Sequence, residues 1–182
     1  MTSRDERLLF TLHGVVRDVL RDSAGRVVWD SGWNKNAIVD DCRRLLSSFM
    51  RGAPIGALGI QGLQVGAGLA AWDAPPGPPP ASTSQTALVD PQPFLLPKAA
   101  LQLDFLAGPV VSATPTNRLQ IAATFGPGVP PWPDGSHSSA TLREFGLVAE
   151  LEGLPVLINY RTHPAIPKDP ASTLERTIWL TF

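Results

Sequence analysis

The sequence contains one cysteine, Cys42, among 182 residues. A single cysteine cannot form a disulfide within the chain, so we expect a fold that does not depend on an oxidising compartment. Long hydrophobic runs are also missing, because no stretch approaches the ~18 apolar residues that a membrane helix needs. The first ten residues, MTSRDERLLF, carry charges of both signs and no apolar central region. We therefore expect no signal peptide and no membrane contact, and export only within a particle released by lysis.

Charge of one sign is not in excess either. The chain has 15 basic and 16 acidic residues and a net charge of −1. Such a balanced chain lacks the electrostatic footprint of a protein that binds nucleic acid or an anionic membrane. We therefore expect no nucleic-acid partner.

Motifs of catalysis and metal binding are absent from the sequence. It has no G-x-S-x-G elbow, no H-E-x-x-H and no paired-cysteine zinc pattern. The segment Gly66–Gly68 lacks the Lys-Ser/Thr of a phosphate loop, so we interpret it as a tight turn. We predict no enzyme, no cofactor and no metal site. A hydrolase or metal site built from His137 and His163, with Asp134 or Asp169, stays open as an alternative.

Proline and glycine are abundant, with 19 and 16 residues. This composition favours many short strands and turns over long helices. We predict one mainly β domain over residues 1–182, an antiparallel β-sandwich with one packed helix. Its expected parts are a hairpin at 8–33, a helix at 37–51 and a sandwich at 58–182, with Pro-rich loops at 73–84 and 126–139.

The stretch Thr141–Tyr160 is predicted to be the centre of that sandwich. Two apolar segments flank Glu152-Gly153, a composition that favours a hairpin. The return strand is apolar on both faces for most of its length, which indicates a doubly covered position. We interpret Arg143 and Glu144 as forming cross-strand charge pairs with Glu175 and Arg176.

The helix at 37–51 is indicated by apolar residues at helical spacing, with Asn36 as its N-cap and Gly52 as its end. Cys42 falls on the apolar face, so we interpret it as a core residue. We also expect a single helical turn near Thr83–Leu88 and a crossing loop at Arg161–Ser172. Strands are expected at Ile60–Val65, Phe94–Leu106 (one long or two short), Val110–Ala113, Arg118–Phe125 and Thr173–Phe182.

Trp132 lies between prolines in the second Pro-rich loop. A loop aromatic in this setting is typical of an interaction anchor, because it offers large contact area at little entropic cost. The alternative, a Trp132 folded back over the core, stays open. The candidate interface residues are Trp132, Trp72, Pro131, Pro133 and His163. With Asp134, the two tryptophans would also form the platform of a carbohydrate-binding β-sandwich, which is our second functional hypothesis.

The order of short motifs along the chain resembles a known family. These are N-x-I-V-D at the helix start (Asn36–Asp40), I-x-x-L-x-V-G-x-G (Ile60–Gly68), T-x-L (Thr86–Leu88), L-R-E-F-G-L (Leu142–Leu147), N-Y-R (Asn159–Arg161), P-x-x-x-K (Pro164–Lys168) and the terminal T-I-W-L-T-F (Thr177–Phe182). Over residues 36–182 the chain resembles small tail and baseplate proteins of tailed bacteriophages and phage-derived particles, including the attachment domains of tail-collar and tail-fibre proteins.

The resemblance implies a non-enzymatic structural subunit of a virion tail, baseplate or fibre-attachment region. Such proteins are β-rich and dock on neighbouring subunits, often in three-fold or six-fold arrays, and the family has no catalytic residues to carry over. The implied partners are copies of the chain itself, as a trimer or hexameric array, and other virion tail, baseplate or fibre proteins. The implied location is the virion, after assembly in the host cytoplasm.

Overall fold

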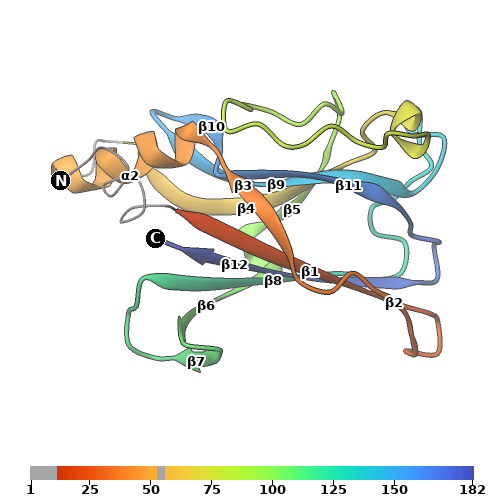
Figure 1. The fold of residues 1–182 in the computed structure, drawn as a ribbon, viewed down its shortest axis with the longest axis horizontal. Helices are drawn as coiled ribbons and strands as arrows, with labels where there is room; N and C mark the ends of the chain where they lie inside the picture. The colour runs from red at the N-terminus through yellow and green to blue at the C-terminus, as the bar shows by residue number, and fades with distance from the viewer. Residues whose placement is uncertain (1–11, 53–55) are drawn as a thin grey trace.

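The protein is a sandwich of two antiparallel layers of strands, with α2 across one end (Figure 1). The computed structural model describes residues 12–52 and 56–182. The elements of this part of the chain are β1 (His13–Arg21), β2 (Val27–Asp30), β3 (Asn34–Ile38), α2 (Asp40–Gly52), β4 (Leu58–Gly66), η1 (Ala70–Asp73), β5 (Phe94–Pro97), η2 (Lys98–Ala100), β6 (Leu101–Ala107), β7 (Val110–Ser112), β8 (Arg118–Phe125), β9 (Thr141–Leu151), β10 (Leu154–Leu157), β11 (Asn159–Pro167) and β12 (Thr173–Thr181).

Strand β3 joins the two layers. One layer holds β1, β12, β8, β6 and β7, the other holds β5, β4, β9 and β11, and β3 pairs with β1 and with β11. Figure 1 shows β3 crossing between the layers. Opposite Asn36, β1 carries Gly14, where an added Cβ would lie 1.9 Å from Asn36 Oδ1. Glycine therefore lets β1 and β3 approach closely enough to pair.

The predicted central hairpin is confirmed. β9 is buried along both faces for most of its length and pairs with β4, β10 and β11. The turn to β10 is made by Glu152 and Gly153 with φ of 56° and 76°, the positive values that a tight hairpin turn of type I′ requires. The mainly antiparallel β fold with a packed helix is thus as the sequence predicts.

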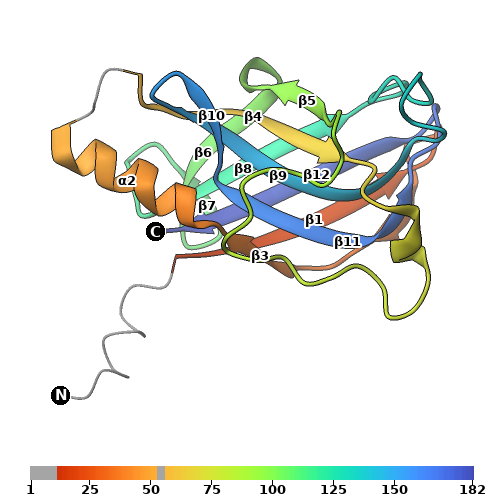
Figure 2. The same ribbon diagram turned by 90° about the horizontal axis from the view of Figure 1, so that it is seen from above.

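The outer face of β9 is covered by the long loop between β4 and β5. Leu88 of this loop packs with Val148, Leu157, Tyr160 and Val39 in a small apolar cluster separate from the main core. Seen from above, the loop crosses over β9 and β11 (Figure 2). This cover is the reason that β9 is buried on both sides.

Helix α2 starts later than predicted. Residues 34–38 pair as β3, so Asn36 is a strand residue and the prediction of an N-cap there is wrong. The backbone N–H of Asp40 instead bonds the carbonyl oxygen of Thr83, 2.8 Å away. Asp40 and Asp41 occupy the first turn and Arg51 the last, as the helix dipole favours. Cys42 is buried, as predicted.

Two other expectations were wrong. Of the loop predicted at Arg161–Ser172, only residues 168–172 form a loop. β11 runs through Pro164 to Pro167, with a register shift between Thr162 and Ile166 where the proline lacks an N–H for the ladder. The expected helical turn at Thr83–Leu88 does not form.

The remaining strand expectations need little change. Phe94–Leu106 forms two short strands, β5 and β6, separated by η2. Of the hairpin expected at 8–33, residues 8–11 lie outside the described part of the chain, and β1 and β2 form the rest.

Candidate interaction surface

Three of the five predicted interface residues are not on the surface. Trp132, Trp72 and His163 keep 6%, 9% and 5% of their surface exposed, whereas Pro131 and Pro133 are exposed. Of the two interpretations of Trp132 left open by the sequence, the exposed anchor is therefore wrong and the tryptophan folded back over the core is confirmed. It folds back over the core, where its ring stacks on His137 with the ring centroids 3.8 Å apart.

His137 holds three loops together. Its Nδ1 lies 2.8 Å from Asp134 Oδ1 and its Nε2 lies 3.0 Å from Asp90 Oδ2. The same Asp90 oxygen accepts the backbone N–H of Ala67 at 2.7 Å. These contacts fix the loops around residues 67, 90 and 134 to one another.

Glu144 is a second internal anchor. It is fully buried and accepts hydrogen bonds from the backbone N–H groups of Val89 and Asp90 at 3.0 and 2.7 Å and from the Tyr160 hydroxyl at 2.6 Å. Burial and the neighbouring carboxylate raise the pKa of Tyr160, so its hydroxyl stays a donor. Glu144 thus ties the long loop to β9 and β11.

The cross-strand charge pairs predicted for β9 and β12 do not form. Arg143 makes a bidentate pair with Asp73 of η1 at 2.8 and 2.7 Å, and Glu175 pairs with Arg21. Arg176 instead points into the core, where it meets Asp18 of β1. The sequence pattern placed charges on strands correctly but could not tell which layer they face.

His163 lies in this Arg176 cluster and not beside His137. Its Nε2 is 3.3 Å from Arg176 Nη2, and its Nδ1 is 2.8 Å from the carbonyl oxygen of Pro164. Burial and the positive charge of Arg176 lower the pKa of His163 to about 3. Neutral His163 therefore accepts a hydrogen bond from Arg176 at its Nε2. The structure does not bring the two loop histidines into one site, and among the described residues no His, Cys, Asp and Glu group could hold a metal ion.

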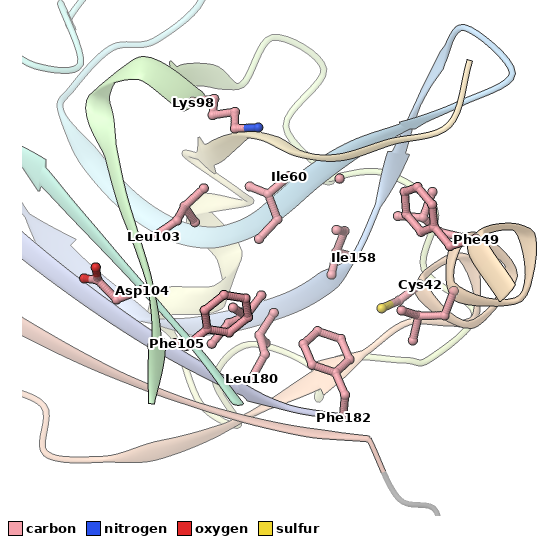
Figure 3. Close-up of a pocket in the computed structure, with 14 residues that line it drawn as sticks. Cys42, Phe49, Ile60, Lys98, Leu103, Asp104, Phe105, Ile158, Leu180 and Phe182 are labelled. Atoms are coloured by element: carbon pink, nitrogen blue, oxygen red, sulfur yellow. The ribbon is translucent and has the colours of Figure 1, made fainter. Parts of the chain in front are cut away.

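An apolar pocket of about 380 Å³ opens between α2 and the two layers (Figure 3). Cys42 and Phe49 of α2 face Ile60, Ile158 and Phe182 across it. Burial raises the pKa of the Cys42 thiol to about 11, so the sulfur is not a reactive thiolate near neutral pH. The pocket can accept an apolar group, and its lining also includes Lys98 and Asp104.

Strand β2 carries the exposed apolar residues that the sequence analysis missed. Val27, Val28 and Trp29 expose 52%, 57% and 41% of their surface. β2 pairs along one edge with β1, and no other strand of the described part of the chain pairs with its second edge. It lies toward the end of the sandwich opposite α2 (Figure 1). Three consecutive apolar residues without alternation, directly after a turn, are the signal that could have revealed it.

The outer face of the β1–β12 layer adds a second aromatic group near β2. Trp33 packs on Trp179 with ring centroids 4.4 Å apart, and the guanidinium of Arg118 lies 5.2 Å from the Trp179 ring. Trp33 is 45% exposed. The exposed tryptophans of the described chain are therefore Trp29 and Trp33, not the two tryptophans predicted from the sequence.

Comparisons with protein-family models, with curated proteins and with solved structures found no match to this chain. Among the described residues, no helix combines the length and apolar character needed to cross a membrane.

Proposed function

We propose that this protein is a non-enzymatic structural subunit of the tail, baseplate or fibre-attachment region of a phage or phage-like particle, and that it assembles through protein–protein contacts at β2. The observation that carries the proposal is the free edge of β2, which exposes three apolar residues and unpaired backbone groups. An uncovered strand edge can pair with another chain.

The internal polar contacts support a structural role. The ionisable side chains that a catalytic site would need are occupied inside the fold: His137 with two carboxylates, Glu144 with three donors, and Arg176 with Asp18. Apart from the contact of His137 with Asp134, each of these contacts joins segments that are distant in sequence. Such contacts give a rigid body that can present β2 and its neighbours in a fixed orientation.

The two tryptophans on which the carbohydrate-binding alternative depends are not available to a ligand. It depended on Trp132 and Trp72 as a sugar platform, and both are buried in the core. Glycan stacking needs an exposed ring face, which neither offers.

Assembly with copies of the chain and with other tail proteins, in a trimer or a hexameric array, follows from the same proposal. Repetition in a ring strengthens a contact that is weak for one pair of subunits. We expect the protein in the virion, assembled in the host cytoplasm.

Incorporation into particles tests this function. Particles produced with the tagged wild-type chain should contain the tag after gradient purification, whereas Val28→Asp should leave the chain folded but absent from the particles. Val111→Asp is the matched control, because Val111 is 54% exposed on β7, another edge strand. Wild-type chain that never enters particles, or equal incorporation of all three chains, would count against the proposal.

A further inference from the structure

The pocket between α2 and the two layers has the size and the lining of a ligand site (Figure 3). Its volume of about 380 Å³ falls within the roughly 300–1,000 Å³ of small-molecule sites, which are mostly apolar with a few polar groups. Of the residues that line it, Leu45, Ile158 and Leu180 are buried, whereas Phe49 and Phe182 are exposed. The pocket therefore runs from the core to the surface at the α2 end of the sandwich.

The charged residues of the lining are Lys98 and Asp104. Leu103 and Phe105, on either side of Asp104 in β6, also line the pocket, and side chains alternate between the two faces of a strand. The Asp104 carboxylate accordingly points away from the pocket (Figure 3) and accepts a hydrogen bond from Gln102 at 2.8 Å.

Lys98 begins η2 and lies at the edge of the pocket. Figure 3 shows its ammonium nitrogen beside the apolar lining. Within the described part of the chain, this ammonium makes no ion pair and no hydrogen bond. The pocket thus combines an apolar interior with an unpaired positive charge at its edge.

We propose that this pocket binds a straight-chain fatty acid, with the hydrocarbon chain between α2 and the two layers and the carboxylate at the Lys98 ammonium. A monocarboxylate supplies the single negative charge that neutralises a single lysine, and its chain removes the apolar lining from water. The pocket lies at the α2 end and β2 lies toward the opposite end, so the inference does not rest on the proposed function (Figure 1).

The hydrocarbon chain supplies most of the affinity, and the head group supplies the selectivity. Burial of each methylene group should strengthen binding about fourfold until the pocket is full. An ion pair at a solvent-exposed lysine adds about two- to fivefold, and salt screens it. Binding should therefore depend on chain length first and on head-group charge second.

Calorimetric titration of the full-length chain with decanoate, below the concentration at which it forms micelles, tests the binding. Decanoate should bind saturably at a single site, and more tightly than octanoate by on the order of tenfold because more methylene groups are buried. Decylamine has the same chain and a positive head group, so it should bind more weakly than decanoate. Absence of saturable decanoate binding, or equal binding of the acid and the amine, would overturn the proposal.

Charge reversal at Lys98 tests the head group. Lys98→Glu should reverse the selectivity, so that decylamine binds more tightly than decanoate. Lys35→Glu is the matched control, because Lys35 is an exposed lysine of β3 outside the pocket lining, and it should keep the wild-type preference for decanoate. Both lysines are exposed, so circular dichroism should show that the variants are folded. The same selectivity in the two variants would overturn the assignment of Lys98.

Cys42 reports whether the ligand lies inside the pocket, since it is the sole cysteine of the chain and lines the pocket on α2. Decanoate should slow the modification of Cys42 by methyl methanethiosulfonate at mildly alkaline pH, followed by mass spectrometry of the full chain. Leu46→Trp narrows the pocket and should weaken decanoate binding. Leu69→Trp, at an exposed position outside the lining, is the control and should leave binding unchanged.

Two results of the Cys42 experiment would refute the site. A modification rate that saturating decanoate does not change would place the ligand outside the pocket and overturn the proposal. A rate that falls with protein concentration and not with decanoate would assign the pocket to a second copy of the chain, and would overturn the proposal as well.

Discussion

The guanidinium of Arg176 on β12 and the carboxylate of Asp18 on β1 form a bidentate pair inside the sandwich, with N–O distances of 2.6 and 2.9 Å. Arg176 is 1% exposed and lies over the Phe145 ring, 3.9 Å from its centroid. The pair therefore joins the two chain-terminal strands of one layer to the central strand of the other.

Removal of one partner of this pair should destabilise the protein strongly. Asp18→Ala leaves a buried guanidinium without its counter-charge, which costs about 3–5 kcal/mol in the free energy of unfolding. Urea denaturation of the wild type and the variant measures this difference in the free energy of unfolding. Glu175→Gln is the matched control on the neighbouring position of β12, and since its pair with Arg21 is partly exposed, it should cost less than about 1 kcal/mol. Equal effects of the two variants would contradict the account of the buried pair.

His163 should make stability fall in mild acid. Its folded pKa of about 3 lies below the ordinary value near 6.5, so between these values the unfolded chain binds a proton that the folded chain does not. Unfolding is therefore favoured as pH falls below 6.5, by up to about 1.4 kcal/mol per pH unit.

Measurements between pH 6.5 and 4.5 isolate this effect, because most carboxylates stay ionised there. His163→Gln keeps an acceptor for Arg176 but has no proton to gain, so the free energy of unfolding should depend less on pH by about 2 kcal/mol over this window. An unchanged pH dependence in the variant would refute the assignment of a buried neutral histidine.

Glu144→Gln should loosen the long loop. The backbone N–H of Val89 bonds Glu144 Oε2 and that of Asp90 bonds Oε1, so the NH2 group that replaces one of these oxygens leaves one of the two donors without its acceptor. A buried donor left without a partner costs about 1–3 kcal/mol. Amide exchange at these two residues should quicken. Glu150→Gln, on the same strand and half-buried, is the control and should leave their exchange unchanged. Slow exchange in both variants would show that the loop does not depend on Glu144.

Trp132→Ala should lower the stability of the fold and should not change binding of a glycan or of a protein partner. Trp132 is buried against His137, and deletion of a buried tryptophan side chain costs about 3–5 kcal/mol. Trp29→Ala, at an exposed position, should lower the thermal midpoint far less. A Trp132→Ala protein with wild-type stability that had lost a glycan ligand would restore the carbohydrate-binding hypothesis.

Elements that are specified by a local sequence pattern could be predicted from the sequence alone. β8 alternates between an apolar and a mainly polar face, and the Glu152-Gly153 turn has residues suited to a hairpin. Pairing over long distances was not predictable in this way. The partner of Arg176 lies 158 residues away, and a strand pattern does not say which charge faces the core.

Prolines and tryptophans misled the prediction for physical reasons. Pro164 was interpreted as a mark of a loop, but a shift of register lets β11 continue past it. Trp132 is flanked by prolines as an exposed anchor would be, and only the stacking on His137 shows that it faces inward. The apolar residues of β2 were visible in the sequence, but their lack of cover depends on how the sheet is ordered.

The most direct test of the central claim compares amide hydrogen exchange of β2 in the free chain and in purified particles. If β2 is the assembly strand, exchange at residues 27–30 should slow at least about tenfold on incorporation, because its free edge becomes hydrogen-bonded. Exchange at these residues that is the same in both states, while amides elsewhere on the chain become protected, would contradict the account.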